Sequence, residues 1–157
     1  MKNKLSAIII GLLSAITLTA CSEGDPALTR FKNEMDAFCT TISEIDTAIN
    51  NVDAESDTAI DELLGHLDEL EEEFADFADV DFPEEFDYLE NLADEASAYM
   101  TEAVTKYHES YSNGSYNEYT AEYAKENYSR AYKRIQIIIS FLHGEEPEDV
   151  DLTTSFE

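Results

Sequence analysis

The chain lacks the residues on which several common functions depend. It contains no tryptophan, two cysteines and three histidines, and its 36 aspartates and glutamates outweigh nine lysines and arginines, giving a net charge of −27. So few basic residues argue against a nucleic acid partner, because phosphate binding depends on Lys and Arg. The charge favours a monomer and repels anionic lipid head groups. A G-x-S-x-G motif and a Gly-rich phosphate loop are also missing, so we expect neither catalysis nor a cofactor.

Long hydrophobic runs are missing too, apart from one near the N-terminus. Lys2 and Lys4 precede an apolar segment, residues 5–18. This segment is shorter than the roughly 20 residues that cross a bilayer comfortably, and it suits the apolar region of an export signal. Ordinary signal cleavage prefers an A-x-A-like site, and Leu18 ahead of Ala20 fits that pattern poorly.

The apolar segment ends in Leu18, Thr19, Ala20 and Cys21. An aliphatic residue, two small residues and a cysteine resemble the lipobox of bacterial prolipoproteins. The resemblance covers residues 1–21 and implies a cleaved signal peptide at residues 1–20, with lipid on the sulfur of Cys21. The alternative is a signal-anchor helix with an incidental cysteine. The resemblance implies anchoring at the outer face of the cell membrane, or, because Ser22 follows, at the outer membrane of a two-membrane bacterium.

Cys39 is the second cysteine, and lipidation of Cys21 leaves it without a disulfide partner. It lies next to Phe38 and three residues before Ile42, at the border of an apolar stripe. We expect a small buried hydrophobic residue here, with a reactive thiol as the alternative.

Four amphipathic segments follow a tether at residues 21–25. Apolar residues recur at alternating spacings of three and four, which is the a/d pattern of bundled helices and coiled coils. The expected helices span residues 26–53, 57–78, 83–112 and 115–143. Asp25–Pro26 suits a helix start, Ser115 and Glu118 form a capping box, and Gly144 suits a helix end.

These segments predict an all-α fold: an antiparallel up-down four-helix bundle (26–143) after the cleaved signal helix, followed by an acidic disordered tail at residues 144–157. The rival fold has three helices and a strand, because residues 135–142 have strong β character. We favour the helix, since its pattern continues through Tyr128 and Ala131 and no second strand is available for pairing. In an up-down bundle the first helix starts where the fourth ends, beside the tether.

Metal-binding patterns are weak. His66 has Glu62 and Glu69 at helical spacing, but a single histidine beside a leucine stripe is more typical of a boundary residue. Acidic residues alternate in the loops at residues 53–57 and 79–81, without the glycine and distal glutamate of an EF-hand. We therefore predict no metal centre and keep weak cation binding as an alternative.

Tyrosines gather around the turn before the fourth helix. Tyr116, Tyr119 and Tyr123 repeat at core spacing, which favours packing at the edge of the core. The alternative is a candidate binding patch for a glycan or peptide, since tyrosine stacks on ligands while its hydroxyl stays hydrated.

Taken together, the sequence predicts a lipid-anchored envelope protein with a structural or interaction role and a protein or polymer partner. A solute- or cation-binding lipoprotein is the alternative.

Overall fold

The computed structural model of the chain describes residues 25–112 and 116–145. Several sequence predictions fall outside this part: the signal peptide at residues 1–20, the lipobox and Cys21, most of the tether, Ser115 of the expected capping box, and the acidic tail from residue 146.

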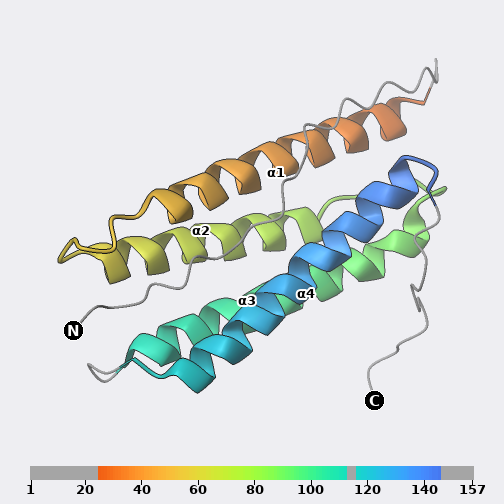
Figure 1. Cartoon of the computed structure of the whole chain (residues 1–157). Coiled ribbons are helices and arrows are strands. Elements are labelled where there is room, and N and C mark those ends of the chain that lie inside the picture. The colour runs from red at the N-terminus through yellow and green to blue at the C-terminus, as the bar shows by residue number, and fades with distance from the viewer. Residues whose placement is uncertain (1–24, 113–115, 146–157) are drawn as a thin grey trace.

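The described residues form four helices and contain no strand. They are α1 (Pro26–Asn51), α2 (Ala59–Ala78), α3 (Glu90–Tyr111) and α4 (Glu118–Leu142), and a short 3-10 helix, η1 (Asp87–Leu89), leads into α3 (Figure 1). The all-helical fold is as predicted. Residues 135–142 are helical throughout, so the rival fold with a strand is wrong.

Side chains and glycine mark the ends of α1 and α4. Asp25 caps α1 by accepting a 2.9 Å hydrogen bond from the amide of Ala27, and Pro26 takes the first helical position, as predicted. Gly144 follows α4 with a φ of 75°, where a left-handed residue was expected. The cap of α4 differs from the prediction: Asn117 accepts a 3.2 Å hydrogen bond from the amide of Thr120, so this helix begins at Glu118.

The start of α3 also differs from the sequence expectation, which placed it at Pro83. Two successive tight turns come first, in which the carbonyl of Pro83 accepts from the amide of Phe86 and the carbonyl of Phe86 accepts from Leu89. Aromatic packing accounts for them, because the rings of Phe82 and Phe86 lie 4.6 and 6.4 Å from the ring of Phe31 on α1. A regular helix from Pro83 would carry the side chain of Phe86 along α3 instead of turning it toward α1.

The core consists mainly of the predicted heptad stripes. The buried stripe of α1 comprises Phe31, Met35, Phe38, Ile42, Ile45 and Ile49, and that of α2 comprises Leu63, Leu67, Leu70, Phe74 and Phe77. The α3 stripe contains several small residues, and Ala93, Ala96 and Ala103 are fully buried. This helix packs most extensively against α4.

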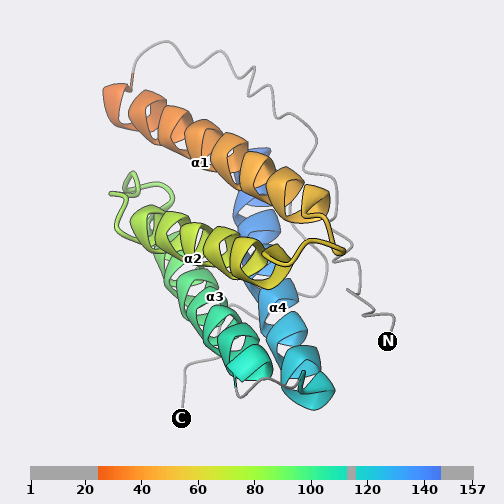
Figure 2. The same cartoon turned by 90° about the vertical axis from the view of Figure 1, so that its left-hand side faces the viewer.

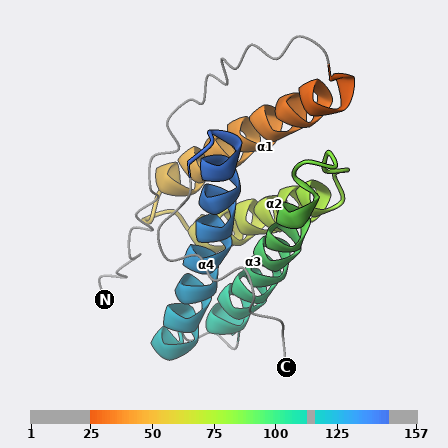
Figure 3. The same cartoon turned by 90° about the vertical axis from the view of Figure 1, so that its right-hand side faces the viewer.

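Consecutive helices are the main packing partners. Backbone packing joins α1 to α2, α2 to α3 and α3 to α4. Figures 2 and 3 show α1 and α2 side by side, with this pair laid against the pair formed by α3 and α4. Long side chains connect α1 to α4, and the contact between Asp46 and Tyr128 is the clearest example.

Two ends of the molecule can be told apart by their contacts. At the phenylalanine end, defined by Phe31, Phe82, Phe86 and Phe141, the start of α1 meets the α2–α3 connection and the end of α4 meets η1. Arg30 on α1 lies 3.6 Å from Asp81, and the ring of Tyr88 lies 5.7 Å from that of Phe141. At the other end, the amide of Asn117 donates to the carbonyl of Ser110, which joins the start of α4 to the end of α3.

Candidate functional site

The tyrosines divide into buried and exposed groups. Tyr107, Tyr128 and Tyr132 are buried, whereas Tyr116, Tyr119 and Tyr123 are 51, 85 and 42% exposed. The expectation that these last three pack at the edge of the core is therefore wrong for Tyr119, whereas Tyr116 and Tyr123 are about half exposed. We call these three residues the tyrosine surface.

The buried face of α4 explains the error. Its stripe runs through Ala121, Ala124, Tyr128, Ala131 and Ile135. Tyr119 lies two residues before Ala121, on the opposite side of the helix, and Tyr123 lies directly before Ala124, at the flank of the buried stripe. The spacing alone cannot tell which of two such stripes is buried. In the structure, the stripe that contains the alanines is the buried one.

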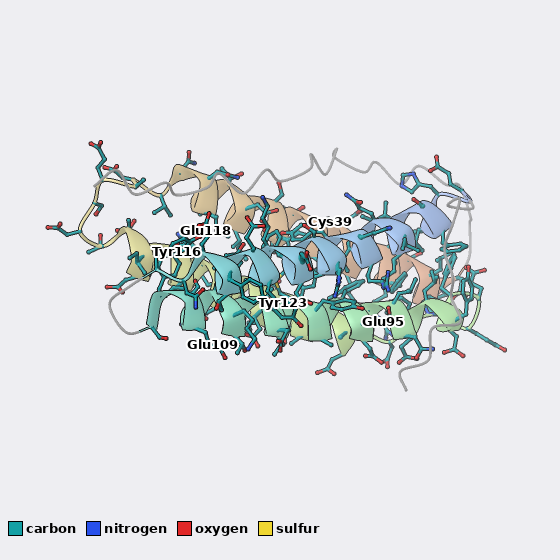
Figure 4. The ribbon with its side chains drawn as sticks, turned by 60° about the horizontal axis from the view of Figure 1, so that its bottom comes forward. Cys39, Glu95, Glu109, Tyr116, Glu118 and Tyr123 are labelled. Atoms are coloured by element: carbon teal, nitrogen blue, oxygen red, sulfur yellow. The ribbon has the colours of Figure 1, made fainter. Side chains whose placement is uncertain are left out.

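The tyrosine surface is surrounded by carboxylates. Figure 4 shows Tyr116 and Glu118 together at the start of α4, with Tyr123 farther along the helix. Partial burial raises the pKa of the Tyr116 hydroxyl, and the negative charges of Glu118 and Glu122 raise it further. The ring of Tyr116 packs 5.3 Å from that of Tyr111. The surface thus presents phenol rings in a negative electrostatic environment.

Two of the nearby basic residues, Lys106 and Arg130, are paired with acids. Lys106 donates to both carboxylate oxygens of Glu109, at 3.1 and 2.9 Å, and this hydrogen bonding raises the pKa of its ammonium group. Arg130, on the following turns of α4, lies 3.8 Å from Glu126. These pairs leave the surroundings of the tyrosine surface with an excess of negative charge.

A buried polar network forms a second cluster. Asp46 on α1 is only 3% exposed, and one of its carboxylate oxygens accepts a 2.6 Å hydrogen bond from the hydroxyl of Tyr128. That hydroxyl lies 3.4 Å from the hydroxyl of Tyr132. The second carboxylate oxygen of Asp46, Oδ2, is buried and has no hydrogen-bond partner among the described residues. The hydroxyl of Tyr128 therefore supports a carboxylate that is shielded from solvent.

Burial determines the protonation behaviour of this network. Desolvation raises the pKa of Asp46, although hydrogen bonding to the two tyrosines partly opposes the shift. Desolvation, followed by the negative charge of Asp46, also raises the pKa of Tyr128, so its hydroxyl stays protonated and able to donate. The sequence interpretation missed Asp46. A signal was present, because Asp46 is four residues after Ile42 and three before Ile49, on the buried face.

Arg134, farther along α4, joins this helix to α3. Arg134 pairs with Glu95, and both side chains are mostly buried. The guanidinium groups of Arg134 and Arg130 lie 5.7 and 5.8 Å from the centre of the Tyr99 ring. Charge pairing and cation–π attraction thus act on the same arginine.

The histidines and acidic loops do not assemble a metal centre. His66 contacts Glu69 at 3.1 Å, but Glu62 instead accepts from the hydroxyl of Thr58. His108 lies 2.6 Å from Asp68, joining α3 to α2. In the loop at residues 53–57, Asp53 accepts from the backbone of Glu55. No group of three or more His, Cys, Asp or Glu in residues 25–112 and 116–145 could hold a metal ion.

Cys39 is half-buried and unpaired, next to the core. Burial, with a smaller contribution from Asp36, raises the pKa of its thiol from 9.0 to about 12. The thiol therefore stays protonated near neutral pH, which opposes nucleophilic chemistry.

Within the described part of the chain, none of the helices combines the length and apolar character needed to cross a membrane. Comparison of the sequence with protein families and curated proteins, and of the structure with solved structures, finds no match.

Proposed function

We propose that the chain is a lipid-anchored, highly acidic helical-bundle lipoprotein of the cell envelope that acts by binding rather than by catalysis. The observation that carries this proposal is the sequence Leu18–Thr19–Ala20–Cys21, placed just ahead of the helical domain. Lipid on Cys21 holds the domain at a membrane surface that its negative charge would otherwise repel. The anchor lies at the outer face of the cell membrane, or at the outer membrane where there are two membranes.

The proposed topology is an antiparallel up-down bundle, supported by the contacts at its two ends. The start of α1, the α2–α3 connection and the end of α4 share the phenylalanine end. The lipid on Cys21 lies close to this end, because the four residues 22–25 reach at most about 14 Å. The tyrosine surface lies on the turns of α4 nearest the other end and so faces away from the membrane.

A binding role is supported by the exposure of the tyrosine surface and by the contacts and protonation of the cysteine and histidine side chains. Three exposed aromatic side chains close together, one just before α4 and two on its first turns, are typical of contact surfaces. Cys39 is held as a neutral thiol, while His66 and His108 are engaged with carboxylates. We therefore propose that the partner is an envelope protein or polymer, that the domain is monomeric, and that it uses no cofactor or metal.

The alternative is a lipoprotein that takes up a solute or cation on its acidic face. One observation favours it: burial and the negative charges of Asp76 and Glu72 raise the pKa of Glu73 on α2. Cations would relieve this crowding of charge. A rise in melting temperature with millimolar calcium, but not with magnesium, would support this alternative.

Acyl labelling in a bacterial host tests the anchor. The wild-type chain should incorporate a labelled fatty acid and fractionate with membranes, and Cys21→Ala should lose both properties. Cys39→Ala is the matched control, because it removes the other cysteine and should leave labelling unchanged. Persistent labelling of Cys21→Ala would refute the proposal.

A further inference from the structure

Exposed apolar side chains are concentrated on one short stretch of the described chain. The large hydrophobic residues with high exposure are Ile60, Tyr88, Tyr116, Tyr119 and Tyr123. Three of them lie within eight residues at the start of α4. Tyr119 and Tyr123 are one helical turn apart and so present their rings side by side.

Exposed carboxylates run alongside these rings. Glu118 and Glu122 are also one turn apart on α4, each directly before a tyrosine of the pair, and both are exposed. Neither is in an ion pair within the described residues, whereas the neighbouring Glu109 and Glu126 are paired with Lys106 and Arg130. The surface therefore presents two aromatic rings next to two carboxylates that are available to a partner.

We infer that the tyrosine surface binds an arginine-rich segment of a partner protein. A guanidinium group can stack on a phenol ring while donating hydrogen bonds to an adjacent carboxylate, and arginine does this better than lysine because its charged group is planar. The net charge of −27 attracts such a segment over a longer range. This inference rests on the proposed binding role and names the chemistry of the partner.

The protein itself uses the same combination. Arg134 pairs with Glu95 and lies over the ring of Tyr99, and Arg130 approaches that ring from the neighbouring turn. On the tyrosine surface, Tyr119 and Tyr123 with Glu118 and Glu122 offer the aromatic and acidic parts of this arrangement without the arginine. A neutral glycan would use the rings alone and would gain nothing from the carboxylates.

Peptide binding to the acylated full chain in nonionic detergent tests the inference. The probe is a fluorescent peptide of alternating arginine and glycine, read by fluorescence anisotropy. Replacement of Tyr119 or Tyr123 by leucine should raise Kd by about two- to fivefold each, the size expected for an exposed cation–π contact. Tyr119→Phe keeps a ring and should bind nearly as the wild type does. Glu118→Gln with Glu122→Gln should weaken binding by a similar factor.

Matched controls separate this site from general attraction to an acidic protein. Tyr88→Leu removes a tyrosine that is also 51% exposed, but at the phenylalanine end. Glu72→Gln with Asp76→Asn removes two exposed acids one turn apart on α2. Both control variants should bind like the wild type, and the same peptide with citrulline in place of arginine should bind at least tenfold more weakly.

Three results would overturn the inference: no binding of the arginine peptide, equal losses in the α2 control, or equal binding of the citrulline peptide. Tyrosine-dependent binding of a neutral oligosaccharide without arginine-peptide binding would identify a glycan surface instead. The lipid anchor is tested separately by acyl labelling of Cys21. A negative result in the peptide-binding experiment would therefore leave the proposed lipid anchor unaffected.

Discussion

The hydroxyl of Tyr128 on α4 donates a 2.6 Å hydrogen bond to the carboxylate of Asp46 on α1. These two helices are distant in sequence and make little backbone contact, so the bond is one of the few polar links between them. Both residues are buried, and Asp46 Oδ2 has no partner in the described part of the chain. The link therefore combines a strong hydrogen bond with an incompletely satisfied charge.

Tyr128→Phe should destabilise the protein by about 1–3 kcal/mol, because the buried carboxylate loses its donor while the ring is kept. Urea denaturation followed by circular dichroism measures the change in the free energy of unfolding. Tyr88→Phe removes a hydroxyl from an exposed ring and should change that free energy by less than about 0.5 kcal/mol. Equal effects in the two variants would mean that the bond to Asp46 contributes nothing.

Asp46→Asn should alter how stability depends on pH. Burial raises the folded-state pKa of Asp46 above its ordinary value of 3.8. Its favourable contribution is therefore complete below the unfolded pKa and is lost as pH rises through the folded pKa. Relative to the wild type, the Asn variant should gain stability as pH rises from about 4 toward neutrality. Urea denaturation of both proteins at each pH measures the difference between their free energies of unfolding. All other carboxylates are present in both proteins, so their contributions cancel in this difference. A difference in the free energy of unfolding that does not change with pH would contradict the raised pKa of Asp46.

Much of the fold follows from periodicity and local rules. The heptad stripe from Phe31 to Ile49 is buried on α1, and Asp25 and Gly144 act at the helix ends where their chemistry suits them. These features are predictable because the hydrophobic pattern and the capping bonds involve residues close in sequence.

Features that depend on distant residues were not predictable in the same way. The late start of α3 reflects the packing of Phe82 and Phe86 on Phe31, far away in the chain. The exposure of Tyr119 depends on which face of α4 meets α3, and two stripes of equal period compete for it. The place of Asp46 on the buried face follows from local spacing, but its hydrogen-bond donor, Tyr128, lies 82 residues away.

Ala96→Leu should destabilise the protein by about 1–3 kcal/mol through overpacking, since Ala96 is fully buried on α3, the helix that packs most closely against α4. Ala98→Leu is the matched control, because Ala98 lies two residues away on the exposed face of the same helix. In thermal denaturation, the melting temperature of Ala96→Leu should be clearly lower than that of Ala98→Leu. A tolerated leucine at Ala96 would show that the core around this residue has room for a larger side chain.

Arg134→Met should cost about 1–3 kcal/mol, because it leaves the mostly buried carboxylate of Glu95 without its partner. The thioether keeps much of the packing against Tyr99, so the loss reports chiefly on the ion pair. Arg30→Met breaks an exposed pair with Asp81 and should change stability by less than about 1 kcal/mol. Denaturant titrations of both variants provide the comparison, and a larger loss for Arg30→Met would contradict this assignment.

Cys39 should react slowly with thiol reagents in the folded protein. Its thiol is half-buried, and its pKa of about 12, against 9.0 for an unperturbed thiol, lowers the thiolate fraction at neutral pH by roughly a thousandfold. Reaction with Ellman's reagent, followed in Cys21→Ala so that Cys39 is the sole cysteine, measures the rate. Addition of urea should raise the rate to that of a free cysteine, because unfolding returns the thiol to water. Rapid reaction without urea would mean that the site opens readily, and the reactive-thiol alternative would then be preferred to the buried one.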